Sequence, residues 1–80
     1  MKFTQYFLYV SQRPDRAKIK TEWIEETIKN PDYIEVQSDG RIRKWKRIEE
    51  EAKFLRVILL SDGETVHNSF FDRSFKGEAK

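Results

Sequence analysis

The chain has 80 residues and a net charge of +2, and this length allows at most one domain, which excludes a doubly wound dinucleotide fold or a (β/α)₈ barrel. Aromatic residues make up 14% of the chain, more than disordered proteins carry, so we expect a folded protein. Cysteine is absent and histidine occurs once, which excludes disulfides, thiolate zinc sites and most histidine metal sites, so we expect no metal and no cofactor.

Residues 3–12 carry two conflicting patterns. Their Tyr, Phe and Val content favours a strand, yet the apolar residues at i, i+4 and i+7 from Phe3 follow one face of a helix. Thr4 suits the N-cap of such a helix, and Pro14 ends either element. We favour the helix and keep the strand as the alternative.

Residues 22–29 predict a second helix. Thr21 is the expected N-cap, glutamates fill the first turn, and Asn30-Pro31 ends the helix. Its apolar face consists of Trp23, Ile24, Thr27 and Ile28.

After Pro31 the hydrophobic period changes to two, which is typical of strands. Asp39-Gly40 and Asp62-Gly63 predict two tight hairpin turns, because Asp-Gly accepts the positive φ that such turns require. The predicted strands cover residues 33–37, 41–48, 54–60 and 65–71. The run 54–60 is the most apolar, so we expect it at the centre of the sheet.

These elements predict the α+β class, with one or two N-terminal helices packed on a four-stranded antiparallel meander sheet. We expect a single domain over residues 1–80, with an ordered core over about 3–73 and a charged C-terminal tail over 74–80.

Charge is unevenly distributed along the chain. Residues 1–47 carry eleven Lys/Arg against seven Asp/Glu, whereas residues 48–80 carry five against seven. Five cations fall within residues 41–47, which suggests an anionic partner. Strand alternation places one group of side chains on a common face, where it would bind RNA phosphates and stack a base: Arg41, Arg43, Trp45 and Arg47. The structural alternative is an edge strand whose cations prevent aggregation while the indole fills the core.

His67 is the only side chain that titrates near neutrality without perturbation. Alternation places it on one strand face with Thr65, Ser69 and Phe71. The catalytic interpretation makes His67 a general acid or base in phosphodiester cleavage, with Arg56 or Arg73 stabilising the transition state. The alternative is a half-buried histidine hydrogen-bonded to a neighbour.

Four stretches together resemble a family of small prokaryotic proteins classed as a domain of unknown function. They are WIEETIKNP (23–31), QSDGRIRKW (37–45), LRV (55–57) and DGETVHNSFFDR (62–73), and the resemblance covers most of residues 13–76. That family is in turn remotely similar to the BrnT and RelE-like ribonuclease toxins of toxin–antitoxin pairs. The resemblance implies a helical segment against an antiparallel sheet, basic residues on the sheet and a small partner protein. BrnT-like relatives often carry a His-Ala pair in the first helix, and the matching stretch here has no histidine.

Three hypotheses therefore stay open: a toxin-like RNA-binding or RNA-cleaving protein, a non-enzymatic module that binds an acidic protein, and an inactive family member. The expected partners are RNA or a small acidic antitoxin-like protein. No apolar run approaches the length of a membrane-spanning helix or a signal peptide, so we expect no membrane partner and a cytoplasmic location.

Overall fold

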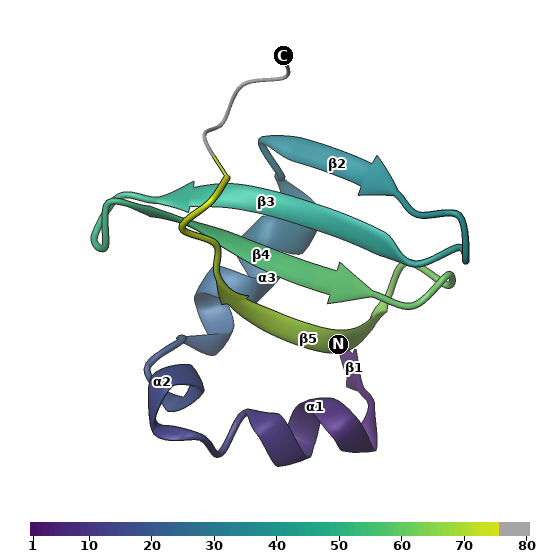
Figure 1. The fold of residues 1–80 in the computed structure, drawn as a ribbon, viewed down its shortest axis with the longest axis horizontal. Helices are drawn as coiled ribbons and strands as arrows, with labels where there is room; N and C mark the ends of the chain where they lie inside the picture. The colour runs from purple at the N-terminus through teal and green to yellow at the C-terminus, as the bar shows by residue number, and fades with distance from the viewer. Residues whose placement is uncertain (76–80) are drawn as a thin grey trace.

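The computed structural model describes residues 1–75 as an α+β fold around a five-stranded sheet in the order β1-β5-β4-β3-β2 (Figure 1). The elements are β1 Lys2–Phe3, α1 Gln5–Val10, α2 Pro14–Ala17, α3 Thr21–Lys29, β2 Tyr33–Val36, β3 Ile42–Ile48, β4 Lys53–Leu59 and β5 Thr65–Phe71. Strands β2 to β5 form the expected antiparallel meander. The prediction of one or two helices and four strands is short of the structure in both respects, because the described residues contain three helices and because β1 adds a parallel pair to β5.

Within residues 3–12 the favoured helix forms over Gln5–Val10, and the strand alternative does not form over those residues. Lys2–Phe3 forms β1, which is too short to show a strand period, and α1 follows from Gln5. Thr4 joins them: its backbone N–H donates to the Val66 carbonyl at 3.0 Å, and its Oγ1 accepts from the Phe7 N–H at 3.0 Å. Thr4 is therefore the N-cap of α1, as the sequence predicts.

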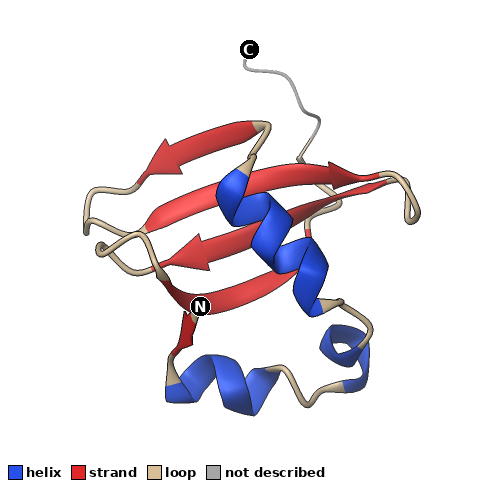
Figure 2. Ribbon diagram, turned by 180° about the vertical axis from the view of Figure 1, so that it is seen from behind, coloured by secondary structure: helices blue, strands red, loops and turns tan. Residues whose placement is uncertain are grey.

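One face of the sheet is covered by α3, which crosses it diagonally, while α1 and α2 lie along the β5 edge (Figure 2). The helix predicted over 22–29 is confirmed, but Lys20 is the N-cap and Thr21 is already helical. The core between α3, α1 and the sheet contains Phe7, Trp23, Ile24, Ile48, Leu55, Val57, Leu59 and Val66.

The Asp-Gly turns adopt the expected backbone. Gly40 has φ +93° and Gly63 has φ +74°, values that favour glycine. Between β3 and β4, Ala52 has φ +53° without being glycine. This third turn follows three glutamates, and its sequence shows no Gly or Asn to indicate the conformation.

β4 lies in the middle of the sheet, so the prediction of a central strand is confirmed. β3 lies between β4 and β2, so its interpretation as an edge strand is wrong. The edge strands are β1 and β2, and in β2 the side chains of Ile34 and Val36 are 59% and 68% exposed. Among the residues described, no helix has the length and apolar character needed to cross a membrane.

The residues that follow β5 pack on the sheet. Residues 72–75 run back over the face of the sheet that α3 leaves open (Figure 1). Asp72 donates its backbone N–H to the Phe54 carbonyl at 2.9 Å, and Phe75 stacks on Trp45. Residues 76–80 of the expected tail lie outside the described residues.

Candidate functional site

The arginines of the basic run 41–47 each face a carboxylate. Arg41 lies 3.8 Å from Asp39, Arg43 lies 3.3 Å from Glu35, and Arg47 lies 3.4 Å from Glu49. All three pairs are partly exposed, so each stabilises the fold weakly. Each pair nevertheless neutralises a cation that the sequence assigns to RNA phosphates.

The two lysines of this run face the other side of β3 and meet the end of α3. Lys44 Nζ donates to the Ile28 carbonyl at 2.9 Å, and Lys46 Nζ donates to the Asn30 carbonyl at 3.1 Å. Carbonyls at a helix C-terminus lack intrahelical donors and carry partial negative charge. Both lysines therefore dock the helix onto the sheet, and the most basic stretch of the sequence serves the fold.

Trp45 is buried on the open face of the sheet, at 5% exposure. Its Nε1 donates to Asp72 Oδ2 at 3.1 Å, and the same oxygen accepts from Arg56 Nε at 3.0 Å and Nη2 at 2.7 Å. Burial alone raises the pKa of Asp72, but hydrogen bonds from Trp45, Ser74 and Arg56 outweigh it and lower the pKa to about 2. Asp72 thus stays ionised and holds Arg56 in place.

The Trp45 ring is covered by the segment that follows Asp72. The Phe75 ring lies parallel to the indole at a centroid distance of 4.5 Å, with 10° between the planes. Tyr33 and Phe54 contact Phe75 edge-on, at 5.2 and 5.1 Å. The indole is therefore closed to a stacking base in this conformation.

His67 sits at a β-bulge, where the β4–β5 register shifts. Ile58 pairs with Asn68 and Leu59 pairs with Val66, so no β4 residue pairs with His67. The expected alternation is therefore wrong: Ser69 is buried against the α3 side, where simple alternation from Val66 would not place it.

The His67 ring is engaged by the N-terminal segment. Its Nδ1 lies 3.2 Å from Thr4 Oγ1, and Tyr6 stacks on it at 4.9 Å. Thr4 Oγ1 also accepts the Phe7 N–H, and the tautomer of the imidazole decides whether His67 Nδ1 donates to this hydroxyl or accepts from it. Burial, followed by the nearby Arg41 charge, lowers the pKa of His67 below 6.5. This environment fits the half-buried structural histidine.

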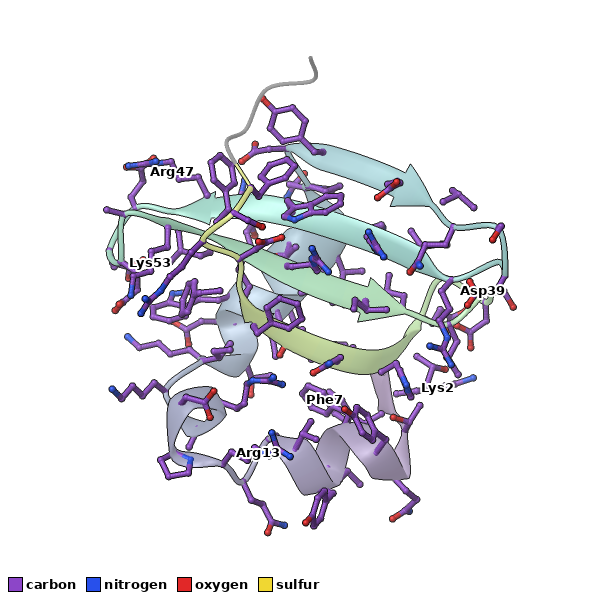
Figure 3. All side chains as sticks on the ribbon, viewed as in Figure 1. Lys2, Phe7, Arg13, Asp39, Arg47 and Lys53 are labelled. Atoms are coloured by element: carbon purple, nitrogen blue, oxygen red, sulfur yellow. The ribbon has the colours of Figure 1, made fainter. Side chains whose placement is uncertain are left out.

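The three residues predicted as catalytic do not share a site. His67 lies at the end of the sheet that carries Lys2 and Asp39, whereas Arg73 follows the opposite end of β5, near Lys53 (Figure 3). From His67 to the end of β5 the strand advances about 12 Å. Arg56 lies between them and is bound to Asp72.

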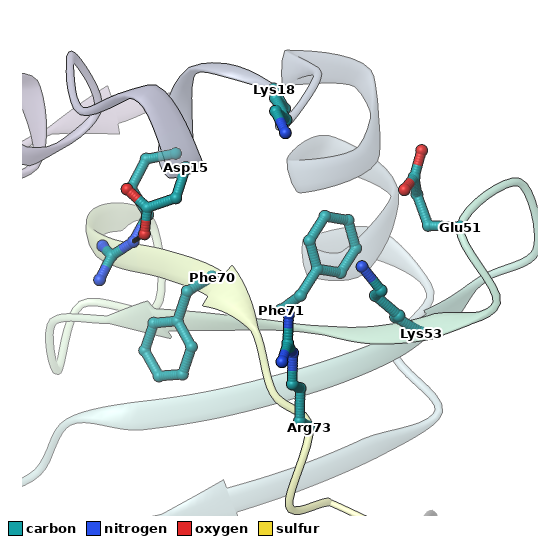
Figure 4. Close-up of a pocket in the computed structure, with 8 residues that line it drawn as sticks. Asp15, Lys18, Glu51, Lys53, Phe70, Phe71 and Arg73 are labelled. Carbon is teal, nitrogen blue, oxygen red and sulfur yellow. Dashed lines mark ion pairs between the residues drawn. The ribbon is translucent and has the colours of Figure 1, made fainter.

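Two adjoining clefts lie at the end of the sheet that carries Arg47 and Lys53 (Figure 3). The α2 cleft, of about 420 Å³, is lined by Asp15, Arg16, Lys18, Glu51, Lys53, Phe70, Phe71 and Arg73 (Figure 4). The turn cleft, of about 340 Å³, is lined by Arg47, Ala52, Lys53, Phe54, Asp72, Arg73 and Phe75. Lys53 and Arg73 belong to both, so we treat the two clefts as one groove.

The groove combines cations with aromatic surface. Five of its residues are cationic and three are acidic. Asp15 pairs with Arg16 at 3.6 Å, Asp72 pairs with Arg56 at 2.7 Å, and Arg47 pairs with Glu49 outside the groove at 3.4 Å. Within the described residues, Lys18, Lys53 and Arg73 form no ion pair. The half-buried rings of Phe70 and Phe71 lie between them. Free cations beside aromatic faces bind phosphates and stack planar groups.

Sequence reasoning finds Arg73 here but misses Lys18 and Lys53. Neither lysine belongs to a charge run or a motif. Lys18, Lys53 and Arg73 lie in three separate parts of the chain. The register of β4 and β5 and the position of α2 bring them together, and no spacing in the sequence indicates this.

The described residues contain no cluster of acidic or histidine side chains suited to hold a metal ion. Comparisons of the chain with protein-family models, with curated proteins and with solved structures gave no match. The resemblance to the domain-of-unknown-function family therefore stays a prediction.

Proposed function

We propose that the protein binds single-stranded RNA along the groove formed by the α2 cleft and the turn cleft. The observation that carries this proposal is the position of Lys53 and Arg73, two exposed cations shared by both clefts and free of ion pairs within the described chain. A phosphate chain that crosses this pair meets Lys18 and the Arg16–Asp15 ion pair on one side, and the Arg47–Glu49 ion pair on the other.

Aromatic surface favours a single strand over a duplex as the ligand. Phe70 is half-buried in the α2 cleft, with Arg16 at 5.3 Å and Arg56 at 4.9 Å from its ring centre. Stacking on such a ring requires an unpaired base, which single-stranded RNA offers and a duplex does not. The proposal is binding without cleavage by His67, because His67 lies at the far end of β5 from the groove.

The test is the salt dependence of binding to a fluorescently labelled oligo(rU), measured by anisotropy. Changing Lys53→Ser and Arg73→Ser together should weaken binding and flatten the slope of log K against log salt by roughly 1.4, since each lost contact with a single strand contributes about 0.7. A matched control removes the same charge elsewhere, with Lys29→Ser and Arg41→Ser, two exposed residues outside the groove. The control should retain the wild-type slope.

Two outcomes would contradict this proposal. If wild type shows no affinity for oligo(rU) at low salt, the chain is not an RNA-binding protein of this kind. If the groove variant and the control lose affinity equally, binding follows net charge and the groove is not the site.

A small acidic protein is the second candidate partner, in keeping with the toxin–antitoxin resemblance. It is favoured by apolar side chains exposed on the N-terminal segment, where Tyr6, Leu8 and Tyr9 are 49%, 44% and 70% exposed. Poly-L-glutamate distinguishes the two candidates. Poly-L-glutamate is added to the oligo(rU) complex at the same concentration of charged groups. If the protein binds poly-L-glutamate as tightly as oligo(rU), the protein partner becomes the better proposal.

A further inference from the structure

The slot beneath Phe75 carries a further inference, which rests on the proposed RNA binding. We infer that the slot formed by Trp45, Tyr33 and Phe54 is a nucleobase site, and that Phe75 occupies it in the absence of RNA. RNA binding would then replace Phe75 by a base, so the C-terminal segment acts as an internal competitor for the ligand.

The geometry of Phe75 is that of a stacked base. Its ring lies parallel to the Trp45 indole at 4.5 Å, while Tyr33 and Phe54 meet it edge-on at 5.2 and 5.1 Å. One parallel face with two flanking edges forms an aromatic box around a flat ring. A nucleobase is flat and has a π-face, so the same box accepts it.

The backbone holds Phe75 only loosely, whereas it holds Asp72 firmly. Asp72 donates its N–H to the Phe54 carbonyl at 2.9 Å, and its carboxylate accepts from Trp45 and Arg56. Beyond it, the Phe75 N–H has one backbone contact within residues 1–75, a weak 3.4 Å bond to the Asp72 carbonyl. Phe75 can therefore leave the slot without unpairing a strand, and Asp72 keeps the indole oriented.

The slot opens onto the groove that the proposed function uses. Phe75 and Phe54 both line the turn cleft, together with Arg47, Lys53 and Arg73. A base in the slot therefore has its phosphates beside Lys53 and Arg73, which form no ion pair within the described residues. Ring–ring stacking and base–ring stacking are of similar strength, so a base with phosphates held nearby competes effectively with Phe75.

The experiment compares wild type with Phe75→Ala and Phe75→Leu on two ligands, a short oligo(rA) and an abasic sugar-phosphate oligomer of the same length. Phe75→Ala empties the slot and should tighten oligo(rA) binding about tenfold, as expected when a competitor closes the site nine-tenths of the time. Phe75→Leu keeps an apolar side chain that lacks a flat ring, so its affinity for oligo(rA) should lie between those of wild type and Phe75→Ala. Neither variant should change the affinity for the abasic oligomer. Oligo(rA) should also quench indole fluorescence more strongly in Phe75→Ala than in wild type.

Phe70→Ala is the matched control, because it removes a phenyl ring from the groove but leaves the slot closed. It should not tighten binding. Circular dichroism confirms that each variant is folded, and if Phe75→Ala unfolds, Phe75→Leu decides the result.

The outcomes separate this inference from the proposed function. If wild type binds oligo(rA) through Lys53 and Arg73, but removal of the Phe75 ring leaves affinity unchanged or weakens it, the slot is not a base site and the groove proposal stands. If both oligomers are tightened equally, the effect is electrostatic and the base site is wrong. If no variant binds either ligand, both proposals fail.

Discussion

The two faces of the sheet bury side chains by different means. Beneath α3, Leu55, Val57 and Leu59 have 0% exposure and contact other apolar groups. On the open face, Trp45 is 5% exposed, and it is covered by a charged pair and an aromatic ring from residues 72–75. The first face is stabilised by burial of apolar side chains, which do not titrate. The second face is stabilised by an ionised carboxylate, so its stability depends on pH.

Under the proposed function, this difference separates the apolar core from the surface that binds RNA. The α3 face is closed by a helix that spans its centre and is held by two lysines at its end. On the open face the Trp45 ring is covered by Phe75, which lies outside the apolar core, while Asp72 is fixed by Phe54, Trp45 and Arg56. The candidate site therefore lies on the face of the sheet whose covering side chain is easier to displace.

Leu55→Ala should have the largest effect, a loss of about 2–5 kcal/mol in the free energy of unfolding, because it leaves a cavity beneath α3. The matched control is Ile58→Ala on the same strand, where the side chain is half-buried on the open face. Urea unfolding measures both. Equal losses would contradict the distinction between the two faces.

Asp72→Asn should cost about 1–3 kcal/mol, because the charged partner of Arg56 is lost while the indole keeps an acceptor. Its signature is in the pH dependence. The pKa of Asp72 is about 2 in the folded protein against an ordinary 3.8, so its stabilisation is complete above about pH 4 and is lost as pH falls through 2.

That difference corresponds to about 2 kcal/mol of acid-sensitive stability, which thermal unfolding between pH 2 and 6 measures in wild type. In Asp72→Asn, the stability lost in acid should be smaller than in wild type by this amount. A part should persist from Asp62, whose pKa is also lowered to about 2, chiefly by the Thr65 hydroxyl and then by backbone N–H groups. An unchanged acid profile in the variant would mean that Asp72 does not control the open face.

Ala52→Gly should stabilise the protein by about 0.5–1 kcal/mol, because φ +53° strains alanine and suits glycine. Ala52 lies in the turn between the strands and belongs to neither buried cluster, so the gain should leave the acid profile unchanged. Urea unfolding at pH 7 measures it. A loss of stability would show that the turn is not strained at this residue.

His67→Gln should have the smallest effect, a fraction of a kcal/mol at neutral pH. Since burial lowers the pKa of His67 below 6.5, wild type should be most stable above pH 6.5 and lose stability as pH falls below it. Glutamine removes this step. RNA binding by the variant should equal that of wild type, and a large loss would return His67 to the functional site.

The fold could be predicted where local physics and tertiary packing agree. The 22–29 helix, the two Asp-Gly turns and the apolar central strand all follow from patterns within ten residues. Three features escape such patterns: β1, the bulge at His67 and the turn at Ala52. A two-residue strand shows no period, a bulge breaks the period by one residue, and strain at alanine has no sequence signal.

The candidate site could be predicted only in part. The basic run 41–47 is the strongest charge signal in the chain, yet its cations pair with nearby carboxylates and with carbonyls at the end of α3. Arg73 was identified from the sequence, but its neighbours Lys18 and Lys53 were not. The density of charge along a sequence indicates where a charged surface can form. Ion pairing in the folded structure decides how much of that charge remains unpaired.

By itself the sequence determined the class of fold, the helix beneath the sheet and the strand at its centre, because each depends on periodicity and on turn residues close together in the chain. Tertiary structure alone decided which cations remain free and which rings are covered. Those properties depend on contacts between residues far apart in sequence, such as Trp45 with Asp72 and Phe75. Such contacts form only once the sheet register aligns their strands, so no local pattern encodes them.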